Sequence, residues 1–403
     1  MRYRYMIWAI VAGVASQLAL LASSAVSAEP PAPLFDIVFP AGARAGESTI
    51  VTVAGRHLES LRELHSNAAG FRSESIEPGK FRLTFPAETT PGVYDLWAVS
   101  ERGVSSPRTF FVGNREEHLE AEPNDLLQSP GAVPLDVTVN GRIEKGGDLD
   151  HFRFEARRGQ RIVIECQAHR IDSRLRAVLE LFDSNGKRLA VNRGYFGIDP
   201  LIDFRVPADG AYVVKVQDLI SSGSAEHYYR LDIDTGSRVA FAVPSVVQRG
   251  KSSRVRLYGW NLAGAGQTQS PSTRPDAIPL DHVDVDVTEA LARVSWPLPV
   301  RLQPAQAVFV GFGYHLPASH ASVALGVTDV PVVLDRSDNH TPASAQLISH
   351  PCEVSGQLVA GDECHWFAIQ AKRGEVLYLE ALGQRINSPV DLQLSVLDAA
   401  GER

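Results

Sequence analysis

The sequence has few cysteines, no basic run and, after its start, no long hydrophobic segment, and each shortage excludes a class of protein. Its three cysteines include no Cys-x-x-Cys pair of the kind that holds zinc. Its 39 basic residues are outnumbered by 47 acidic ones, for a net charge of −8, so nucleic acid is not expected as a partner. After residue 28, no segment is long and apolar enough to span a bilayer.

Motifs of catalysis are missing as well. The sequence contains no His-Glu-x-x-His, no Gly-x-Ser-x-Gly, no P-loop and no Gly-x-Gly-x-x-Gly pattern. The histidines are scattered. His340, His350 and His365 lie near one another in the sequence, but His350 and His365 flank a loop and need not converge, so we interpret all three as surface or turn residues. We expect no catalytic residues, no organic cofactor and no enzymatic activity.

Residues 1–28 are typical of a signal peptide. Arg2 and Arg4 make a basic start, an apolar stretch follows from Ile7 to Leu21, and Val26-Ser27-Ala28 offers small residues for cleavage. A retained membrane anchor is the alternative, but the apolar stretch is short for a spanning helix. We therefore expect an exported protein that is secreted or lies at the cell surface or in the periplasm.

The rest of the chain has the pattern of an all-β protein. Its 25 prolines and 32 glycines are spread along the whole length, and amphipathic helical periodicity is nearly absent. Apolar and polar residues alternate instead, for example in 48–53, 81–85 and 93–99, which is typical of half-buried antiparallel strands. We predict tandem β-sandwiches, and a chain of this length holds about three or four such domains.

An internal repeat divides the chain into alternating modules. Residues 124–188 match residues 339–403 without a gap, at a constant offset of 215. A fainter match, at an offset of 204, relates the segment around Gly55 to the segment around Gly259. The predicted modules are A1 (34–113), B1 (116–236), A2 (239–331) and B2 (332–403). A duplicated array argues against one catalytic pocket spread over the chain.

The A modules share a short motif. In A1 it comprises Pro40, Gly46, Val51, Gly55 and Leu58, and it closes with Pro91-Gly92-Val93-Tyr94. This pattern, with its closely spaced short strands, resembles the IPT/TIG family of immunoglobulin-like cell-surface domains, which implies an immunoglobulin-like sandwich. A2 repeats the first half of the motif at Pro244, Gly250, Val255, Gly259 and Leu262 and lacks the second half.

B1 carries a longer signature. In chain order it contains Glu122-Pro123-Asn124-Asp125, Asn140-Gly141, Asp148-Leu149-Asp150-His151-Phe152, Arg158-Gly159, Asp183-Ser184-Asn185-Gly186 and Pro207-Ala208-Asp209-Gly210-Ala211-Tyr212. This set resembles the bacterial pre-peptidase C-terminal (PPC) domain family, and B2 repeats part of it. The resemblance implies a jelly-roll-like β-sandwich that is itself non-catalytic and often accompanies secreted peptidases. The alternation with immunoglobulin-like modules also resembles large exported surface proteins of planctomycete-type bacteria.

B2 stops at Arg403, the counterpart of Arg188 in B1. The strands expected in B1 at 201–205, 211–217 and 228–232 have no counterpart in B2. We therefore expect the chain to be a fragment of a longer protein.

An acidic cluster precedes the B1 sandwich. Its candidate ligands all carry side-chain oxygen: Glu120, Glu122, Asn124, Asp125, Asp148 and Asp150. Hard oxygen ligands suit calcium. Some PPC-like domains also resemble collagenase-type collagen-binding modules, in which a matching Glu-x-Glu-x-Asn-Asp segment and downstream aspartates hold calcium, so the resemblance implies the same metal. An acidic linker followed by a turn is the alternative. In B2 the positions of Asp125 and Asp150 are histidines, which are poor calcium ligands, so we expect calcium in B1 and not in B2.

The cysteines differ in their expected roles. Cys352 and Cys364 bracket a predicted hairpin with strands at 354–358 and 366–369, and in an exported protein they could close a disulfide. Cys166 lies in an apolar run, and we expect a small buried side chain there.

These observations predict a non-catalytic, multi-domain binding or adhesion protein of the bacterial cell surface, whose partner is an extracellular protein or polysaccharide. The alternative is the accessory region of a secreted peptidase or other hydrolase whose catalytic domain lies outside these residues. A plain spacer is a third reading. Tyr195 and Phe196 could stack on a sugar or a peptide, or could fasten their own loop.

Overall fold

The structure, a computed structural model, describes residues 31–262, 264, 266–267, 279–288, 310–317, 319, 322–336, 338–383, 386, 388, 390–398 and 400–401. The predicted signal peptide at 1–28 and most of residues 264–279, for which the Pro/Ser/Thr-rich sequence predicts a polar loop in A2, lie outside these residues. The described chain consists of β-strands with short 3-10 helices and no α-helix, which confirms the predicted all-β class. None of its helices is long and apolar enough to cross a membrane.

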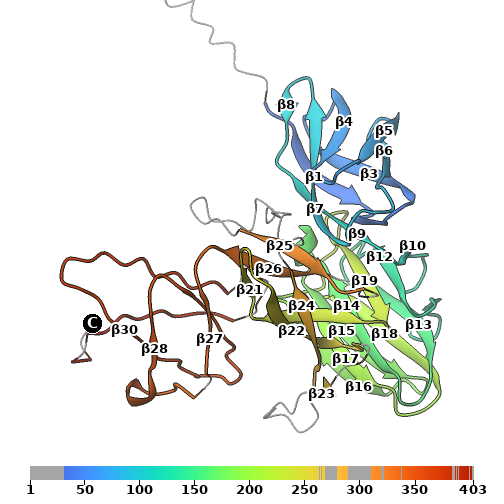
Figure 1. Ribbon diagram of the computed structural model, residues 1–403. Helices are drawn as coiled ribbons and strands as arrows, with labels where there is room; N and C mark the ends of the chain where they lie inside the picture. The colour runs from blue at the N-terminus through green and yellow to red at the C-terminus, as the bar shows by residue number, and fades with distance from the viewer. Residues whose placement is uncertain are drawn as a thin grey trace, which may run out of the picture.

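A1 is a sandwich of two sheets (Figure 1). Its strands are β1 (Leu34–Phe39), β2 (Gly42–Arg44), β3 (Ser48–Arg56), β4 (Leu61–Ser66), β5 (Arg72–Glu77), β6 (Lys80–Thr84), β7 (Gly92–Ser100), β8 (Gly103–Val104) and β9 (Arg108–Gly113). One sheet has the order β1-β3-β6-β5 and the other β2-β9-β7-β4, with β8 paired to β7. The predicted alternation holds in β3, where Val51 and Val53 are buried and their neighbours are exposed, because successive side chains point to opposite faces.

B1 is a larger sandwich with five strands in each sheet. Its strands are β10 (Glu116–Leu119), β11 (Gly131–Ala132), β12 (Val137–Arg142), β13 (Leu149–Ala156), β14 (Arg161–Gln167), β15 (Ala177–Asp183), β16 (Arg188–Asn192), β17 (Leu201–Arg205), β18 (Gly210–Asp218) and β19 (Tyr228–Asp234). The sheets have the orders β10-β12-β19-β14-β17 and β11-β13-β18-β15-β16. Between them lies an apolar core that includes Phe152, Ile164, Leu179, Val214 and Leu231.

The turn predicted at Asp183-Ser184-Asn185-Gly186 joins β15 to β16 as a hairpin. The Asp183 carboxylate accepts a hydrogen bond from the main-chain N–H of Asn185 at 2.9 Å. Gly186 has a φ of +79°, a conformation that costs a glycine little. Asp183 therefore serves as the hydrogen-bond acceptor of this turn, and Gly186 provides its left-handed backbone conformation.

A2 repeats both sheets of the A1 fold with fewer described strands, including late strands that correspond to β7 and β9 of A1. Its strands are β20 (Arg238–Val243), β21 (Val246–Gln248), β22 (Ser253–Trp260), β23 (Gly266–Gln267), β24 (Asp281–Val287), β25 (Gly311–His315) and β26 (Ser322–Thr328), in sheets β20-β22-β24-β23 and β21-β26-β25. The glycine shared by the two A motifs sits beside a register shift in both modules. A Cβ on Gly55 would lie 1.9 Å from the Leu34 carbonyl oxygen, and a Cβ on Gly259 would lie 2.0 Å from the Arg238 carbonyl oxygen.

B2 keeps the strand register of B1 over its described start. Its strands are β27 (Val332–Leu334), β28 (Gln346–Ile348), β29 (Glu353–Ser355) and β30 (Phe367–Ile369). In B1, β10 pairs in parallel with β12 and β11 with β13; in B2, β27 pairs in parallel with β29 and β28 with β30. The pairs Gly131–Phe152 and Gln346–Phe367 differ by the repeat offset of 215.

The predicted hairpin between 354–358 and 366–369 is therefore wrong, because both strands hydrogen-bond to earlier segments. The disulfide expected to close that hairpin is not formed either. Cys352 and Cys364 are free thiols that precede strands of two different sheets. Cys166 is fully buried, as expected.

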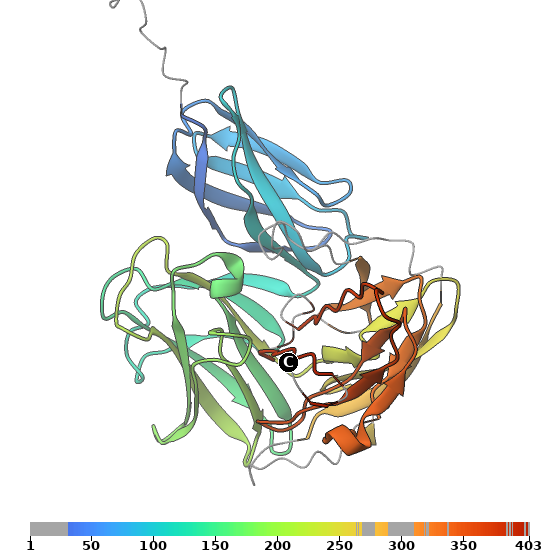
Figure 2. The same ribbon diagram turned by 90° about the vertical axis from the view of Figure 1, so that its left-hand side faces the viewer.

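The modules lie side by side (Figure 2) and contact one another through small apolar clusters and through hydrogen bonds. A1 meets B1 where the Asp172 carboxylate accepts a hydrogen bond from the Thr109 N–H at 2.8 Å. A1 meets A2 where the Ser322 hydroxyl donates to the Pro91 carbonyl at 2.7 Å. A2 meets B2 where the Ser245 N–H donates to the Ser355 hydroxyl at 2.9 Å.

Candidate functional site

The acidic cluster of B1 lies where the segment after β10 meets the start of β13. One carboxylate oxygen from each of Glu120, Glu122 and Asp150 lies within 4.8 Å of the others. Asp125 and Asp148 both lie near Lys145, whose Nζ is 4.0 Å from Asp125 and 3.9 Å from Asp148. The structure thus brings three of the six predicted ligands into one group and places two others together beside a lysine.

Two members of the group share a single hydrogen-bond donor. The Tyr229 hydroxyl lies 2.5 Å from Oδ2 of Asp150 and 3.0 Å from Oε2 of Glu120. A hydroxyl carries one proton, so it donates fully to only one of these oxygens. The other Glu120 oxygen accepts a hydrogen bond from the main-chain N–H of Arg142. The Tyr229 hydroxyl and the Arg142 N–H therefore satisfy only some of the carboxylate oxygen atoms of Glu120 and Asp150.

Further polar atoms at this place are buried and unpaired. Among the described residues, Oδ1 of Asp150 and both side-chain polar atoms of Asn124 are buried and have no hydrogen-bond partner. Both residues are fully buried. Unpaired buried polar groups are costly in a folded protein, and a bound cation is one way to satisfy oxygen atoms of this kind. The residues present therefore fit a hard divalent cation such as calcium.

Burial also disfavours the charged forms of these carboxyl groups. It raises the pKa of Asp150 to about 9, and the neighbouring charge of Glu120 adds to the effect. It raises the pKa of Glu120 to about 7. The pKa of Glu122 is also raised, first by burial and then by nearby acidic groups that include Asp148 and Asp125. A cation bound among the three would reverse this preference by compensating their charge.

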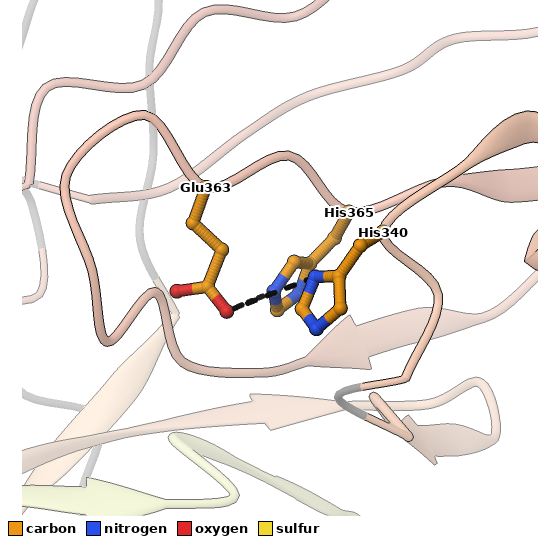
Figure 3. A group of neighbouring side chains, drawn as sticks. All are labelled: His340, Glu363 and His365. Atoms are coloured by element: carbon orange, nitrogen blue, oxygen red, sulfur yellow. Dashed lines mark hydrogen bonds and ion pairs between the residues drawn. The ribbon is translucent and has the colours of Figure 1, made fainter. Parts of the chain in front are cut away.

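A second cluster lies in B2 (Figure 3). Nitrogen atoms of His340 and His365 and an oxygen of Glu363 all lie within 4.8 Å of one another. The interpretation of these histidines as surface or turn residues is wrong for His365, whose side chain is 7% exposed. His350, by contrast, is separate, since its Nε2 lies 3.0 Å from the Gln370 carbonyl oxygen. The repeat alignment, which sets His340 and His365 opposite Asp125 and Asp150, was the signal that could have found this cluster.

The predicted aromatic pair of B1 is packed against protein. The Tyr195 ring centroid lies 4.9 Å from that of Phe196 and 5.9 Å from that of Trp260 in A2. The guanidinium of Arg170 lies 4.6 Å over the Phe196 ring. These contacts favour the role of a loop fastener over that of a sugar-stacking platform.

No family model matches the chain. A stretch of 100 residues, 24% of this chain, is 38% identical to a probable subtilase-type serine protease of Deinococcus radiodurans. The matched part spans 14% of the length of that relative.

The solved structures that are similar to part of the chain include a pre-peptidase domain and a lysozyme inhibitor. The pre-peptidase C-terminal domain of a collagenase from Bacillus anthracis has a TM-score of 0.23 and 15% identity, and the match covers 28% of this chain and 100% of that one. PliG, a periplasmic inhibitor of g-type lysozyme from Aeromonas hydrophila, has a TM-score of 0.20 and 17% identity, with coverage of 29% and 99%.

Proposed function

We propose that the chain is a non-catalytic binding region of an exported bacterial protein, whose linked β-sandwiches present one fixed surface to an extracellular protein or polysaccharide. The proposal rests chiefly on a buried network of ion pairs. It lies on the face of the sheet β10-β12-β19-β14-β17 that is turned away from the B1 core, since its residues alternate with core residues along each strand.

Three buried arginines form this network and tie the neighbouring modules to B1. Arg115, between β9 and β10, pairs with Asp232 at 3.3 Å and with Asp234. Arg238, in the first strand of A2, pairs with Asp232 at 2.7 Å and with Glu165. Asp232 is therefore paired with one arginine that precedes the first strand of B1 in the sequence and with one that follows its last strand.

The third arginine, Arg230, pairs with Glu117 and lies 4.5 Å over the ring of Phe111 in A1. Burial alone would raise the pKa of Asp232, but Arg115, Arg238 and Arg230 outweigh it and hold that pKa well below its usual range.

Such a network favours one arrangement of A1, B1 and A2. A buried charge that loses its partner costs several kcal/mol, so reorientation of a module about these contacts is disfavoured. A preorganised surface binds with a smaller entropic cost than one assembled from freely moving domains. This is the property expected of a region that binds or positions a partner.

We also propose that B1 holds a calcium ion through Glu120, Glu122 and Asp150, with Asn124 as a further oxygen donor. When bound, calcium supplies the positive charge that offsets the mutual repulsion of these carboxylates. By binding one ion together, these residues would hold the segment after β10 against the start of β13.

Co-sedimentation tests the binding proposal. The chain is incubated with collagen fibrils, microcrystalline cellulose or purified peptidoglycan, in millimolar calcium or in excess chelator. We expect at least one polymer to retain the chain well above an albumin control, and retention to fall with the chelator. Retention at the level of albumin on all three polymers would contradict the proposal.

The alternative function is that of an accessory region of a secreted peptidase or other hydrolase. The identity shared with a subtilase-type serine protease favours it. In that case the chain would bind the protein polymer, collagen, and leave both polysaccharides unbound, so retention on cellulose or peptidoglycan would contradict the alternative.

A further inference from the structure

The cluster of His340, Glu363 and His365 in B2 occupies the place that the acidic cluster occupies in B1. The repeat offset of 215 relates Asp335 to Glu120, His340 to Asp125, Glu363 to Asp148 and His365 to Asp150. Strand register is the same in both copies around these residues.

Two local contacts confirm the equivalence. A Cβ on Gly141 would lie 2.5 Å from Oε2 of Glu120, and a Cβ on the equivalent Gly356 would lie 2.7 Å from Oδ2 of Asp335. The carbonyl of Asn124 accepts a hydrogen bond from the N–H of His151 at 3.2 Å, and that of Asn339 accepts one from Trp366 at 2.7 Å. A carboxylate thus lies over the same glycine in each copy, beside a site whose ligand atoms differ.

We propose that B2 binds a divalent transition-metal ion of the zinc class through His340, Glu363 and His365. Imidazole nitrogen with one carboxylate suits zinc and its neighbours, whereas calcium requires six to eight oxygen ligands. His365 replaces Asp150, a member of the acidic group of B1, so the ligand atoms that the two copies offer to a metal differ. This inference stands independently of the function proposed above.

His365 is oriented for this role. Its Nδ1 contacts Oδ2 of Asp335, and its Nε2 lies 3.0 Å from Oε1 of Glu363. A neutral imidazole carries one proton, so when Nδ1–H donates to Asp335 the Nε2 lone pair faces the cluster. A carboxylate behind the ring is the arrangement that orients metal-binding histidines in proteins.

The other two ligands complete an open site. Nδ1 of His340 lies 3.9 Å from the same Glu363 oxygen, and its side chain is 48% exposed. Ligands of one zinc ion lie about 2.0–2.2 Å from it, so the exposed His340 ring must move inward slightly to close the set. A cavity of about 580 Å³, lined in part by His340, Glu363 and Trp366, adjoins the cluster. Three protein ligands beside such a cavity leave a coordination position for water or an exogenous ligand.

The test is zinc titration of the full chain, produced without a histidine tag and freed of metal by a chelator. We expect one zinc equivalent that millimolar calcium does not displace. His340→Ala, which alters an exposed side chain, and His365→Ala should each weaken this binding at least about tenfold, and Asp335→Asn should weaken it about 10- to 100-fold. Cobalt should give the intense visible absorption of a four-coordinate site in the wild-type chain and lose it in the same variants.

His350→Ala is the matched control, because His350 lies in the same module and outside the cluster. It should leave both the affinity for zinc and the cobalt spectrum unchanged. The proposal is overturned if His340→Ala and His365→Ala bind zinc as the wild type does, if His350→Ala weakens binding equally, or if calcium displaces the zinc. Far-ultraviolet circular dichroism of each variant establishes that the chain remains folded.

Discussion

The Asp218 carboxylate accepts hydrogen bonds from both the main-chain N–H and the hydroxyl of Ser222, at 2.9 and 2.8 Å. Asp218 ends β18, and its side chain also accepts from the N–H groups of Arg176 and Ile220. Burial alone would raise the pKa of Asp218, but these hydrogen bonds outweigh it and lower the pKa below 3.8. One ionised side chain thus organises the turn after β18.

A depressed pKa makes this contribution dependent on pH. The charged form is favoured in the folded protein, so the stabilisation is fully present above the unfolded pKa and is lost as the pH falls through the lower folded pKa. We expect Asp218→Asn to lower the melting temperature at pH 7, and the difference from the wild type to shrink below pH 3.8. Thermal melts across this range check it. A difference independent of pH would contradict the assigned charge.

Replacement of Arg238 by methionine tests the ion-pair network. It leaves Glu165 and Asp232 buried without this partner, which should cost about 3–5 kcal/mol of unfolding free energy. Arg254→Met is the matched control: Arg254 pairs with Asp284 at the surface, and its loss should cost less than about 1 kcal/mol. Urea denaturation followed by tryptophan fluorescence measures both. Equal shifts in the two variants would show that the network does not hold the modules.

Calcium should stabilise the chain through B1. At about 100 times its dissociation constant, a ligand adds roughly 2.7 kcal/mol of stability, which is visible as a rise in melting temperature. Burial favours the protonated form of Asp150 in the metal-free protein at neutral pH, and Asp150→Asn removes the cost of that proton uptake, so the variant should melt higher than the wild type in chelator and gain nothing from calcium. Melts with calcium and with chelator measure both effects. A wild-type melting temperature that calcium leaves unchanged would reduce the cluster to an acidic linker.

Gly141→Ala should disrupt the proposed calcium site of B1, because its methyl group would clash with two side chains of that site. The added methyl would lie 2.3 Å from the Tyr229 hydroxyl and 2.5 Å from the Glu120 carboxylate, and Tyr229 is fully buried and cannot move away. Overpacking of this kind costs about 1–3 kcal/mol, and the calcium response should disappear with it. Gly147→Ala is the control, because its Cβ would meet open space; it should be destabilised by backbone strain alone and keep its response to calcium.

Local sequence patterns predict the strands and several turns of this fold, but they do not predict which strands pair. Alternation in 48–53 and the Asp-Ser-Asn-Gly turn at 183–186 are properties of consecutive residues, and both appear as expected. Pairing of β29 with β27 and of β30 with β28 depends on main-chain hydrogen bonds between distant segments. Main-chain groups are the same in every residue, so no side-chain pattern marks the partner, and the hairpin predicted there was wrong.

The candidate sites likewise contain some residues that the local sequence predicts and others that it does not. Glu120, Glu122 and Asp150 could be named because their residue types gather in two short segments. Tyr229, which donates to Asp150 across 79 residues, comes from β19 and carries no local mark. His365 was misread because it was judged by its own neighbours, and His340, although exposed as predicted, was not linked to it. Their position opposite two acidic residues of the other copy was already present in the repeat.

Turnover tests the central claim, that the chain binds without catalysis, most directly. The purified chain is incubated with casein, an ester substrate and the polymers used for co-sedimentation, and released product is measured against a buffer blank. The account predicts no release above the blank for any substrate. Release that a single point mutation in this chain abolishes would contradict it.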